Sequence, residues 1–455
     1  MSNTLEYSIT PSLQTRLRGE VIFQDHEFYD KARRVWNGRI DKYPFMIVRC
    51  LDVTDVLTAI EFAHEWNMPV AVRSGGHSMV GYSVTDGGIV IDLSDMKGIW
   101  IDQMKRVAQV QAGVTLGEFV HQTQAYGLAT TTGTVSGTGV GGLTLGGGIG
   151  WLMGTYGMTI DNLLSADVIT ADGQVLTTSA TKHPELFWGL RGGGGNFGIV
   201  TSFEFQLHQV GQVLAGKLVY PLEKAREVLS FYREYTSKAP DELTAYAVLE
   251  STSTGMPVIV INLCYSGNLS EGAHQVEPLK NFGSPLVDLV HVRPYSQTIS
   301  HDAGAPDGRH YYEKAYSFRE LSDEVIDIVA DYSTSRTSPH SQILIQHVHG
   351  AASRVNKSAT AFALRDVPYV MNIVAAWDPY EANQVEQHMQ WANNLQAVLE
   401  TYAERGVYTN FLGDEGEERV RASYGSNYER LVTLKNTYDP TNFFQLNQNI
   451  KPTHV

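Results

Sequence analysis

The sequence of 455 residues predicts an α+β fold with two unlike parts, on three observations. A strand–helix–strand pattern over residues 44–74 favours parallel strands, because a helical crossover returns the chain in the same direction. Near Val210 the pattern changes to longer alternating strands and amphipathic helices. These continue to about Arg405 and indicate an antiparallel sheet with helices on one face. The tail reads as a helix, a proline stop and a polar end rich in Asn and Gln.

Hydrophobic spacing and turn residues predict each element. The first helix places Val56, Leu57, Ile60 and Ala63 on one face. In the first part, the expected set is a strand at 44–51, a helix at 52–67, strands at 68–74, 87–102 and 106–116, a helix at 116–127, a hairpin at 165–176 turning at 171–173, and a helix, glycine loop and strand within 183–210. In the second part, strands are expected at 244–252, 257–267, 341–352 and 369–377, and helices at 222–236 and 385–405.

Charge and composition narrow the function classes. The net charge of −15 argues against nucleic acid and anionic membranes as partners, because both are themselves negative. The first residues have no basic and apolar leader, so we expect no signal peptide and a cytoplasmic protein. Cys50 and Cys264 are expected to be buried free thiols, and no metal-type spacing is present. Nothing in the pattern specifies an oligomeric state.

One long segment, Phe119 to Ile160, contains no Asp, Glu, Lys or Arg. A membrane helix is the first hypothesis for such a stretch. Gly and Thr dominate it, however, and no run of about 20 residues is mostly Leu, Ile, Val or Phe. We therefore predict backbone wrapped around a large, mostly apolar ligand.

Three glycine-rich stretches indicate one extended ligand. The stretch "AVRSGGHSMVG" sets His77 between paired glycines and a serine, and "RGGGGNFG" sets four glycines between a helix and a strand. The third, "GTGVGG", satisfies the dinucleotide fingerprint, but no apolar strand precedes it and no acidic residue follows at the right distance. A nicotinamide site is therefore disfavoured. Backbone N–H groups of such loops can hold a diphosphate.

Longer motifs carry a family resemblance. The segments "VRSGGHS", "GGIVIDLSDM", "AGVTLGEF", "GVGGLTLGGGIGWLMGTYG", "DNLLSADVITADG", "HPELFWGLRGGGGNFGIVTSFEF" and "YDPTNFFQLNQNI" follow one another over nearly the whole chain. Together they resemble the berberine-bridge-enzyme-like branch of the vanillyl-alcohol-oxidase flavoproteins. The resemblance implies a PCMH-type FAD-binding domain from residues 1–209 and a C-terminal return at 406–455. It implies a central α+β substrate domain at 210–405.

The resemblance also implies FAD attached covalently through a His, which aligns with His77. The glycines around it allow the backbone to approach the flavin closely. The residues expected to contact the cofactor are Arg73, Ser74, Gly75, Gly76, His77, Ser78, Gly81, Val135, Gly137, Thr138, Gly141, Gly142, Gly147, Gly150, Tyr156, Gly157, Asn162, Gly198, Ile199, Asn447 and Asn449.

Two positions depart from the plant-type pattern of this family. Val135 stands where many members carry a Cys that forms a second covalent bond to the flavin. We therefore expect attachment through His77 only, as in small bacterial members. Thr138 stands where members carry the residue that controls oxygen access, and its small size predicts that dioxygen reaches the flavin.

The catalytic base is less well specified. Asn372 replaces a Glu or Gln of the family, and Phe411 replaces the second Tyr of a Tyr-x-Asn-Tyr motif; neither can accept a proton. Tyr408 keeps its family position and is the first candidate, provided that its pKa is lowered. His347 and His349 are the other candidates, because imidazole titrates in the useful range.

The expected function is that of an FAD-dependent oxidase. A C–H bond next to an alcohol, amine or hemiacetal delivers hydride to the flavin, and dioxygen leaves as hydrogen peroxide. The expected partners are therefore a small-molecule substrate and dioxygen. Two alternatives stay open. One is a polyketide-type tailoring oxidase or oxygenase of natural-product biosynthesis, and the other is a flavin-bearing binding protein without turnover.

Overall fold

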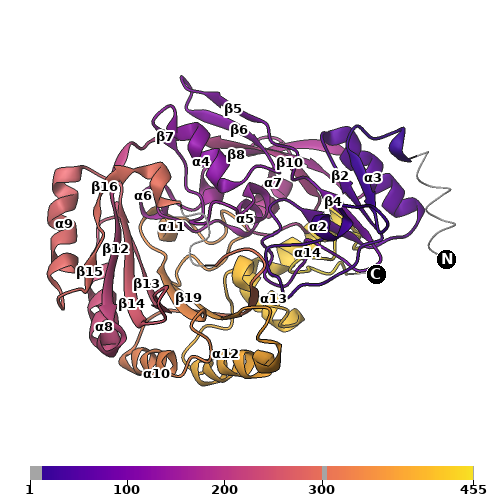
Figure 1. Cartoon of the computed structure of the whole chain (residues 1–455). Coiled ribbons are helices and arrows are strands. Elements are labelled where there is room, and N and C mark those ends of the chain that lie inside the picture. The colour runs from indigo at the N-terminus through magenta and orange to yellow at the C-terminus, as the bar shows by residue number, and fades with distance from the viewer. Residues whose placement is uncertain (1–12, 300–304, 454–455) are drawn as a thin grey trace.

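The structure, a computed structural model, describes residues 13–299 and 305–453, which form two lobes (Figure 1). The first lobe is built around a four-stranded and a five-stranded sheet, and the second lobe is built around an eight-stranded sheet. The termini of the described chain lie in the first lobe, and the orange and salmon elements of Figure 1 form the second lobe. Within the described residues, no helix is both long and apolar enough to cross a membrane.

A four-stranded sheet begins the first lobe. Its order is β1 (Glu20–Phe23), β2 (Met46–Arg49), β4 (Ile89–Asp92) and β3 (Val70–Arg73). Helix α3 (Val53–Glu65) connects β2 to β3, and Asp52 caps it by accepting from two backbone N–H groups. The expected parallel direction is confirmed, but β2 and β3 do not pair with each other: each pairs with β4. All four residues of β4 are buried, as expected for a strand that has a neighbouring strand on each side.

A five-stranded antiparallel sheet completes the first lobe. Its order is β5 (Ile99–Asp102), β6 (Val107–Gln111), β10 (Ile199–Gln206), β8 (Leu163–Ile169) and β9 (Val175–Ser179). The β8–β9 hairpin turns at residues 170–174, as predicted. Helix α4 (Leu116–Gln124) begins with a capping box of Thr115 and Glu118, and α7 (Pro184–Leu190) precedes the four-glycine loop.

The glycine-rich run is not extended throughout. It forms two short helices, α5 (Val140–Gly146) and α6 (Met153–Tyr156), joined by a loop. The fingerprint "GTGVGG" therefore opens a helix, but a loop rather than an apolar strand precedes it.

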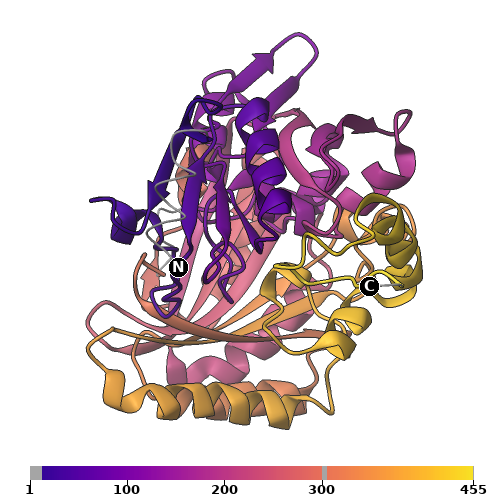
Figure 2. The same ribbon diagram turned by 90° about the vertical axis from the view of Figure 1, so that its right-hand side faces the viewer.

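The second lobe is one antiparallel eight-stranded sheet. Seven strands follow the order β15 (Val287–Asp288), β12 (Gln212–Pro221), β14 (Pro257–Tyr265), β13 (Leu243–Ser251), β18 (Gln342–His347), β19 (Tyr369–Trp377) and β17 (His310–Phe318), while β16 (His291–Pro294) pairs with β12. Helices α8 (Ala225–Thr236), α9 (Leu269–Asn281), α10 (Asp323–Thr334) and α12 (Val385–Leu399) cover one face, as Figures 1 and 2 show. Their apolar sides share one core with that face of the sheet, so the other face is left to meet the first lobe.

The C-terminal segment packs on the first lobe. Helix α14 (Tyr428–Tyr438) places Leu431 and Leu434 in the core of that lobe, beside α7. Lys435 is fully buried, and its ammonium donates to Asp439 at 2.7 Å and to the carbonyls of Asn196 and Phe444 at 2.9 Å. A buried cation requires such partners, and these bonds fix the tail beside the four-glycine loop.

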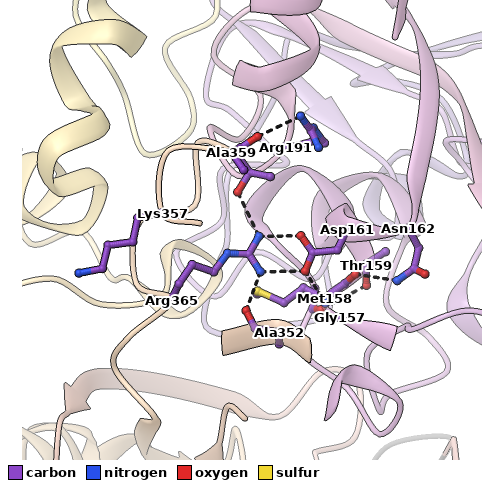
Figure 3. Close-up of polar contacts among 12 residues, drawn as sticks. Gly157, Met158, Thr159, Asp161, Asn162, Arg191, Ala352, Lys357, Ala359 and Arg365 are labelled. Atoms are coloured by element: carbon purple, nitrogen blue, oxygen red, sulfur yellow. Dashed lines mark hydrogen bonds and ion pairs between the residues drawn. The ribbon is translucent and has the colours of Figure 1, made fainter. Parts of the chain in front are cut away.

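The connection between β18 and β19 crosses from the second lobe to the first. It contains α11 (Ala351–Arg354) and ends near Arg365, which is 1% exposed. Figure 3 shows its guanidinium forked on Asp161, with Nη1–Oδ2 and Nη2–Oδ1 distances of 2.8 and 2.7 Å. The same guanidinium donates to the Ala352 carbonyl and to Thr360 Oγ1, while Arg191 donates to the Ala359 carbonyl nearby. This buried ion pair fastens the β18–β19 connection to Asp161 of the first lobe.

Candidate active site

A cavity of about 450 Å³ lies between the lobes. Its size is that of a small-molecule or cofactor site. Two surfaces bound it. The glycine wall consists of loops and α5 of the first lobe, at residues 74–83, 133–149 and 194–200. The sheet wall consists of the open face of β17, β18 and β19. Residues 408–412 and 444–448 of the C-terminal segment close the cavity.

The glycine wall begins where β3 ends. Ser74 turns inward and its hydroxyl donates to the Ala112 carbonyl. Gly75 lies directly against Gly139: a Cβ on Gly75 would come within 2.2 Å of the Gly139 nitrogen. Only glycine allows this contact, and it brings the His77 loop against the start of α5.

His77 faces the cavity from this wall. Its Nδ1 lies 3.5 Å from Thr138 Oγ1, and Gly137 is so close that a Cβ there would lie 3.2 Å from Nε2. Trp36 stacks on the ring at 5.2 Å, and Tyr311 of β17 stacks on Trp36 at 4.2 Å. Burial lowers the pKa of His77, against a smaller opposite effect from Asp307. The imidazole is therefore neutral at pH 7 and keeps a lone pair for bond formation.

The register of the sheet wall sets its side chains in rows. Glu313 of β17 pairs with Val374 of β19, which pairs in turn with Gln342 of β18. One row further, Asn372 of β19 pairs with Leu344 of β18. All five residues line the cavity, because alternate residues of a strand share one face.

Tyr408 lies at the edge of the cavity. Its hydroxyl oxygen accepts from the Gly148 N–H at 2.9 Å and from Asn410 Nδ2 at 2.7 Å, and Phe411 packs edge-on against its ring. Burial raises the pKa of Tyr408 to about 12, in spite of those two donors. The lowered pKa that a tyrosine base requires is therefore absent, and the side chain is a neutral phenol at pH 7.

His347 and His349 do not line the cavity. His347 points to the helix-covered side of the sheet and packs against Tyr369, because it shares a strand face with Ile343 and Ile345. His349 stacks on His347 at 5.1 Å and its Nε2 lies 3.2 Å from Thr244 Oγ1. Burial lowers the pKa of His347 to about 3 and that of His349 to about 4. The structure thus corrects their selection as base candidates.

The remaining predicted residues fall into two groups. Those that line the cavity, besides His77, Tyr408 and Asn372, are Ser74, Gly75, Gly76, Ser78, Val135, Thr138, Gly141, Gly142, Gly198, Ile199 and Asn447. Those that do not line it are Arg73, Gly81, Gly137, Gly147, Gly150, Tyr156, Gly157, Asn162 and Asn449. Arg73, for example, is buried between the Ala32 and Ser83 carbonyls, beside Asp92. Tyr156 stacks on His208 at 3.9 Å.

Sequence reasoning missed Glu313. Its side chain is 5% exposed, lines the cavity and has no ion-pair partner within the described residues. It follows two tyrosines in "HYYEKAYSF", a strand whose one face, residues 311, 313, 315 and 317, is buried throughout, while the other face is buried only at Tyr316 and Phe318. Both faces carry polar and aromatic side chains, so the sequence does not tell them apart, and only a glutamate without a cation partner could have signalled the cavity.

The chemistry of the lining fits a flavin cofactor. Gly142 and Gly195 line the cavity, and a Cβ on either would meet no protein atom within 4 Å, so their backbone faces open space. Three amide oxygens of the lining, Asn372 Oδ1, Asn447 Oδ1 and Gln346 Oε1, are buried without a protein partner. Buried polar atoms and bare backbone together require a ligand with both apolar and hydrogen-bonding surface.

Comparison with known proteins agrees with this arrangement. Residues 44–179 match the family described as FAD binding domain, and residues 407–451 match the one described as Berberine and berberine like. The uncharacterised FAD-linked oxidoreductase YgaK of Bacillus subtilis (strain 168) is 33% identical, over 96% of this chain and 98% of that protein.

Two solved structures share the fold. That of 6-hydroxy-D-nicotine oxidase from Arthrobacter nicotinovorans has a TM-score of 0.88 at 28% identity, covering 96% of this chain and 98% of that one. That of glucooligosaccharide oxidase from Acremonium strictum, described with a 6-S-cysteinyl, 8α-N1-histidyl FAD, has a TM-score of 0.88 at 24% identity. It covers 98% of this chain and 100% of that one.

Fold and cavity thus define an α+β flavoprotein of the PCMH type, an enzyme that binds FAD. The chain belongs to the berberine-bridge-enzyme-like family of FAD-linked oxidoreductases. Oxidases occur among its relatives.

Proposed function

We propose that this protein is an oxidase that removes hydride from a C–H bond next to an alcohol, amine or hemiacetal, with FAD attached through His77 alone. One observation carries the proposal: a half-buried neutral imidazole faces the cavity, beside loop residues that include no cysteine. Val135 and Thr138 lie in this loop. Both cysteines, Cys50 and Cys264, are buried elsewhere and do not line the cavity.

The glycine wall would hold the cofactor by its backbone. Ser74 to Ser78 and Gly139 to Gly142 bring two loops together. Their backbone N–H groups, apart from those of Val140 and Gly141, which donate to the Val114 carbonyl and to Ser74 Oγ, would bind a diphosphate. Asn447 and the glycines at 194–195 lie across the same cavity. Bound FAD supplies hydride acceptance and passes both electrons to dioxygen, which leaves as hydrogen peroxide.

The sheet wall would orient the substrate. Gln342, Gln346 and Asn372 present amide groups that can bind hydroxyl or amine groups of a substrate. Tyr408 binds the Gly148 N–H and so fixes the loop between α5 and α6, while its phenol stays protonated. Thr138 leaves space at the flavin for dioxygen.

Product analysis tests this proposal. The purified holoenzyme is mixed with 6-hydroxy-D-nicotine, a glucooligosaccharide and simple alcohols and amines, first without and then with dioxygen. We expect one chemical class to bleach the flavin absorbance anaerobically and, in air, to yield one hydrogen peroxide per oxidised molecule. Bleaching without peroxide would contradict the oxidase assignment. Incorporation of oxygen into the product would indicate the tailoring oxygenase, and no bleaching by any compound would indicate a binding protein.

A further inference from the structure

We propose that Glu313 is the catalytic base, the group that takes the O–H or N–H proton of the substrate as hydride leaves the neighbouring carbon. This inference rests on the proposed oxidase function. Asn372 occupies the expected position of the proton acceptor on β19, and Glu313 lies on the adjacent strand β17.

The cavity lining leaves few alternatives. Among the described lining residues, Glu313 is the one side chain that is an Asp, Glu, Lys or Arg. His77 is assigned to the flavin, and burial raises the pKa of Tyr82 and Tyr408 to about 12 and also raises that of Tyr424. The fourth lining tyrosine, Tyr311, donates its hydroxyl to the Pro306 carbonyl. A substrate proton therefore finds one carboxyl group in the cavity.

Position in the sheet supports the same residue. Glu313 pairs with Val374, and Asn372 lies two residues from Val374 on the same strand face. Diagonal neighbours across antiparallel strands are about 7–8 Å apart at Cα, within reach of long side chains. A Glu at 313 can thus reach the space that a longer acidic side chain at 372 would occupy.

The surroundings of Glu313 tune its basicity. Burial, and then the charge of Glu415, raise its pKa well above the ordinary value. Glu415 comes from the loop before α13 (Glu417–Tyr424), and its carboxylate lies 3.6 Å from Lys314 Nζ and 3.5 Å from Arg419 Nε. These cations face Glu415, while the neighbours of Glu313 in the sheet, Val374 and Gln342, are uncharged.

In the proposed reaction, FAD accepts the hydride of the substrate and Glu313 accepts its proton. The substrate C–H bond breaks with both electrons going to FAD as hydride, and the O–H or N–H bond breaks with its proton going to a Glu313 carboxylate oxygen. A C=O or C=N double bond forms. Because Glu313 must be ionised to accept the proton, flavin reduction should accelerate as pH rises through its pKa and then level off.

Three variants test the assignment in the holoenzyme. Glu313→Gln keeps the shape but cannot accept a proton. Glu415→Gln removes the like charge. Glu250→Gln is the matched control, because Glu250 is also a glutamate whose pKa burial raises, but it lies outside the cavity lining. The readouts are a pH titration of flavin absorbance without substrate, and the anaerobic rate of flavin reduction across pH.

We expect the wild-type flavin absorbance to titrate, Glu313→Gln to abolish that transition and Glu415→Gln to shift it to lower pH. With a substrate from the panel, Glu313→Gln should slow flavin reduction at least about 100-fold and remove its rise with pH. Glu250→Gln should change neither. Reduction within a few-fold of wild type, with the same pH profile, would overturn the proposal. So would an absorbance titration that Glu313→Gln leaves unchanged. If no panel compound reduces the wild-type flavin, the proposed oxidase function fails, and the titration still decides whether Glu313 faces the flavin.

Discussion

The two walls of the cavity are built on different principles. On the glycine wall, contacts such as Gly75 against Gly139 leave no room for side chains, and the backbone itself presents the binding surface. On the sheet wall, β17, β18 and β19 present side chains in rows, and these set the chemistry. One wall is thus suited to a cofactor common to many enzymes, and the other to a particular substrate.

The walls also differ in tolerance. Where backbone packs against backbone, any added side chain disrupts the surface. Where side chains form the surface, one residue can be replaced without moving the backbone. Asn372 and Glu313 illustrate this difference, because an amide and a carboxyl stand on adjacent strands of the same wall. We therefore expect substitutions of the closely packed glycines to affect folding and flavin content, and those on the sheet wall to affect rates.

The largest effect should come from breaking the buried ion pair that ties the β18–β19 connection to the first lobe. Arg365→Met removes one partner of the buried pair with Asp161 and should lower the free energy of unfolding by about 3–5 kcal/mol. Denaturant titration measures this loss. The control is Arg319→Met, which removes an exposed arginine paired with Asp366 and Glu404 and should cost at most about 1 kcal/mol. Equal losses in both variants would refute a special role for the buried pair.

Gly75→Ala should come next. The new Cβ would overlap the Gly139 backbone, so we expect a destabilisation of about 1–3 kcal/mol and a loss of bound flavin. Gly211→Ala is the matched control, since a Cβ there meets no atom within 4 Å and the site lies outside the cavity lining. Normal flavin content in Gly75→Ala would mean that the loops of Gly75 and Gly139 can move apart without weakening flavin binding.

Tyr408→Phe should have a smaller effect. The variant leaves the Gly148 N–H and the Asn410 amide without their shared acceptor, which should cost about 1 kcal/mol in unfolding free energy. If Glu313 is the base, flavin reduction should slow less than about 10-fold, well below the loss of a general base. A slowing of 100-fold or more would restore Tyr408 as the proton acceptor.

Thr138→Leu should change least. The larger side chain should slow reoxidation of reduced flavin by dioxygen by less than about 10-fold, or 1.4 kcal/mol in activation free energy. Stopped-flow mixing with dioxygen measures this step, and anaerobic reduction by substrate serves as the internal control. Equal slowing of both half-reactions would indicate general damage to the site rather than a narrowed oxygen path.

The sequence predicted the glycine wall far better than the sheet wall, for a physical reason. His77, Gly75 and Gly76 are neighbours in the chain, so a short motif is enough to bring them together at the cavity. Placing Glu313 beside Asn372 requires the register of two strands that a long connection separates, and local spacing does not contain it. The error over His347 and His349 has the same origin. The alternation within β18 was correct, but which face met the cavity depended on helices far along the chain.

Release of flavin by acid tests the central claim, that His77 alone joins the cofactor to the glycine wall. Wild-type protein precipitated with acid should stay yellow. His77→Ala should release all of its flavin into the supernatant, where absorbance measures it, and Cys50→Ser and Cys264→Ser should release none. If wild-type protein loses all flavin in acid, or if His77→Ala keeps it, attachment through His77 is wrong.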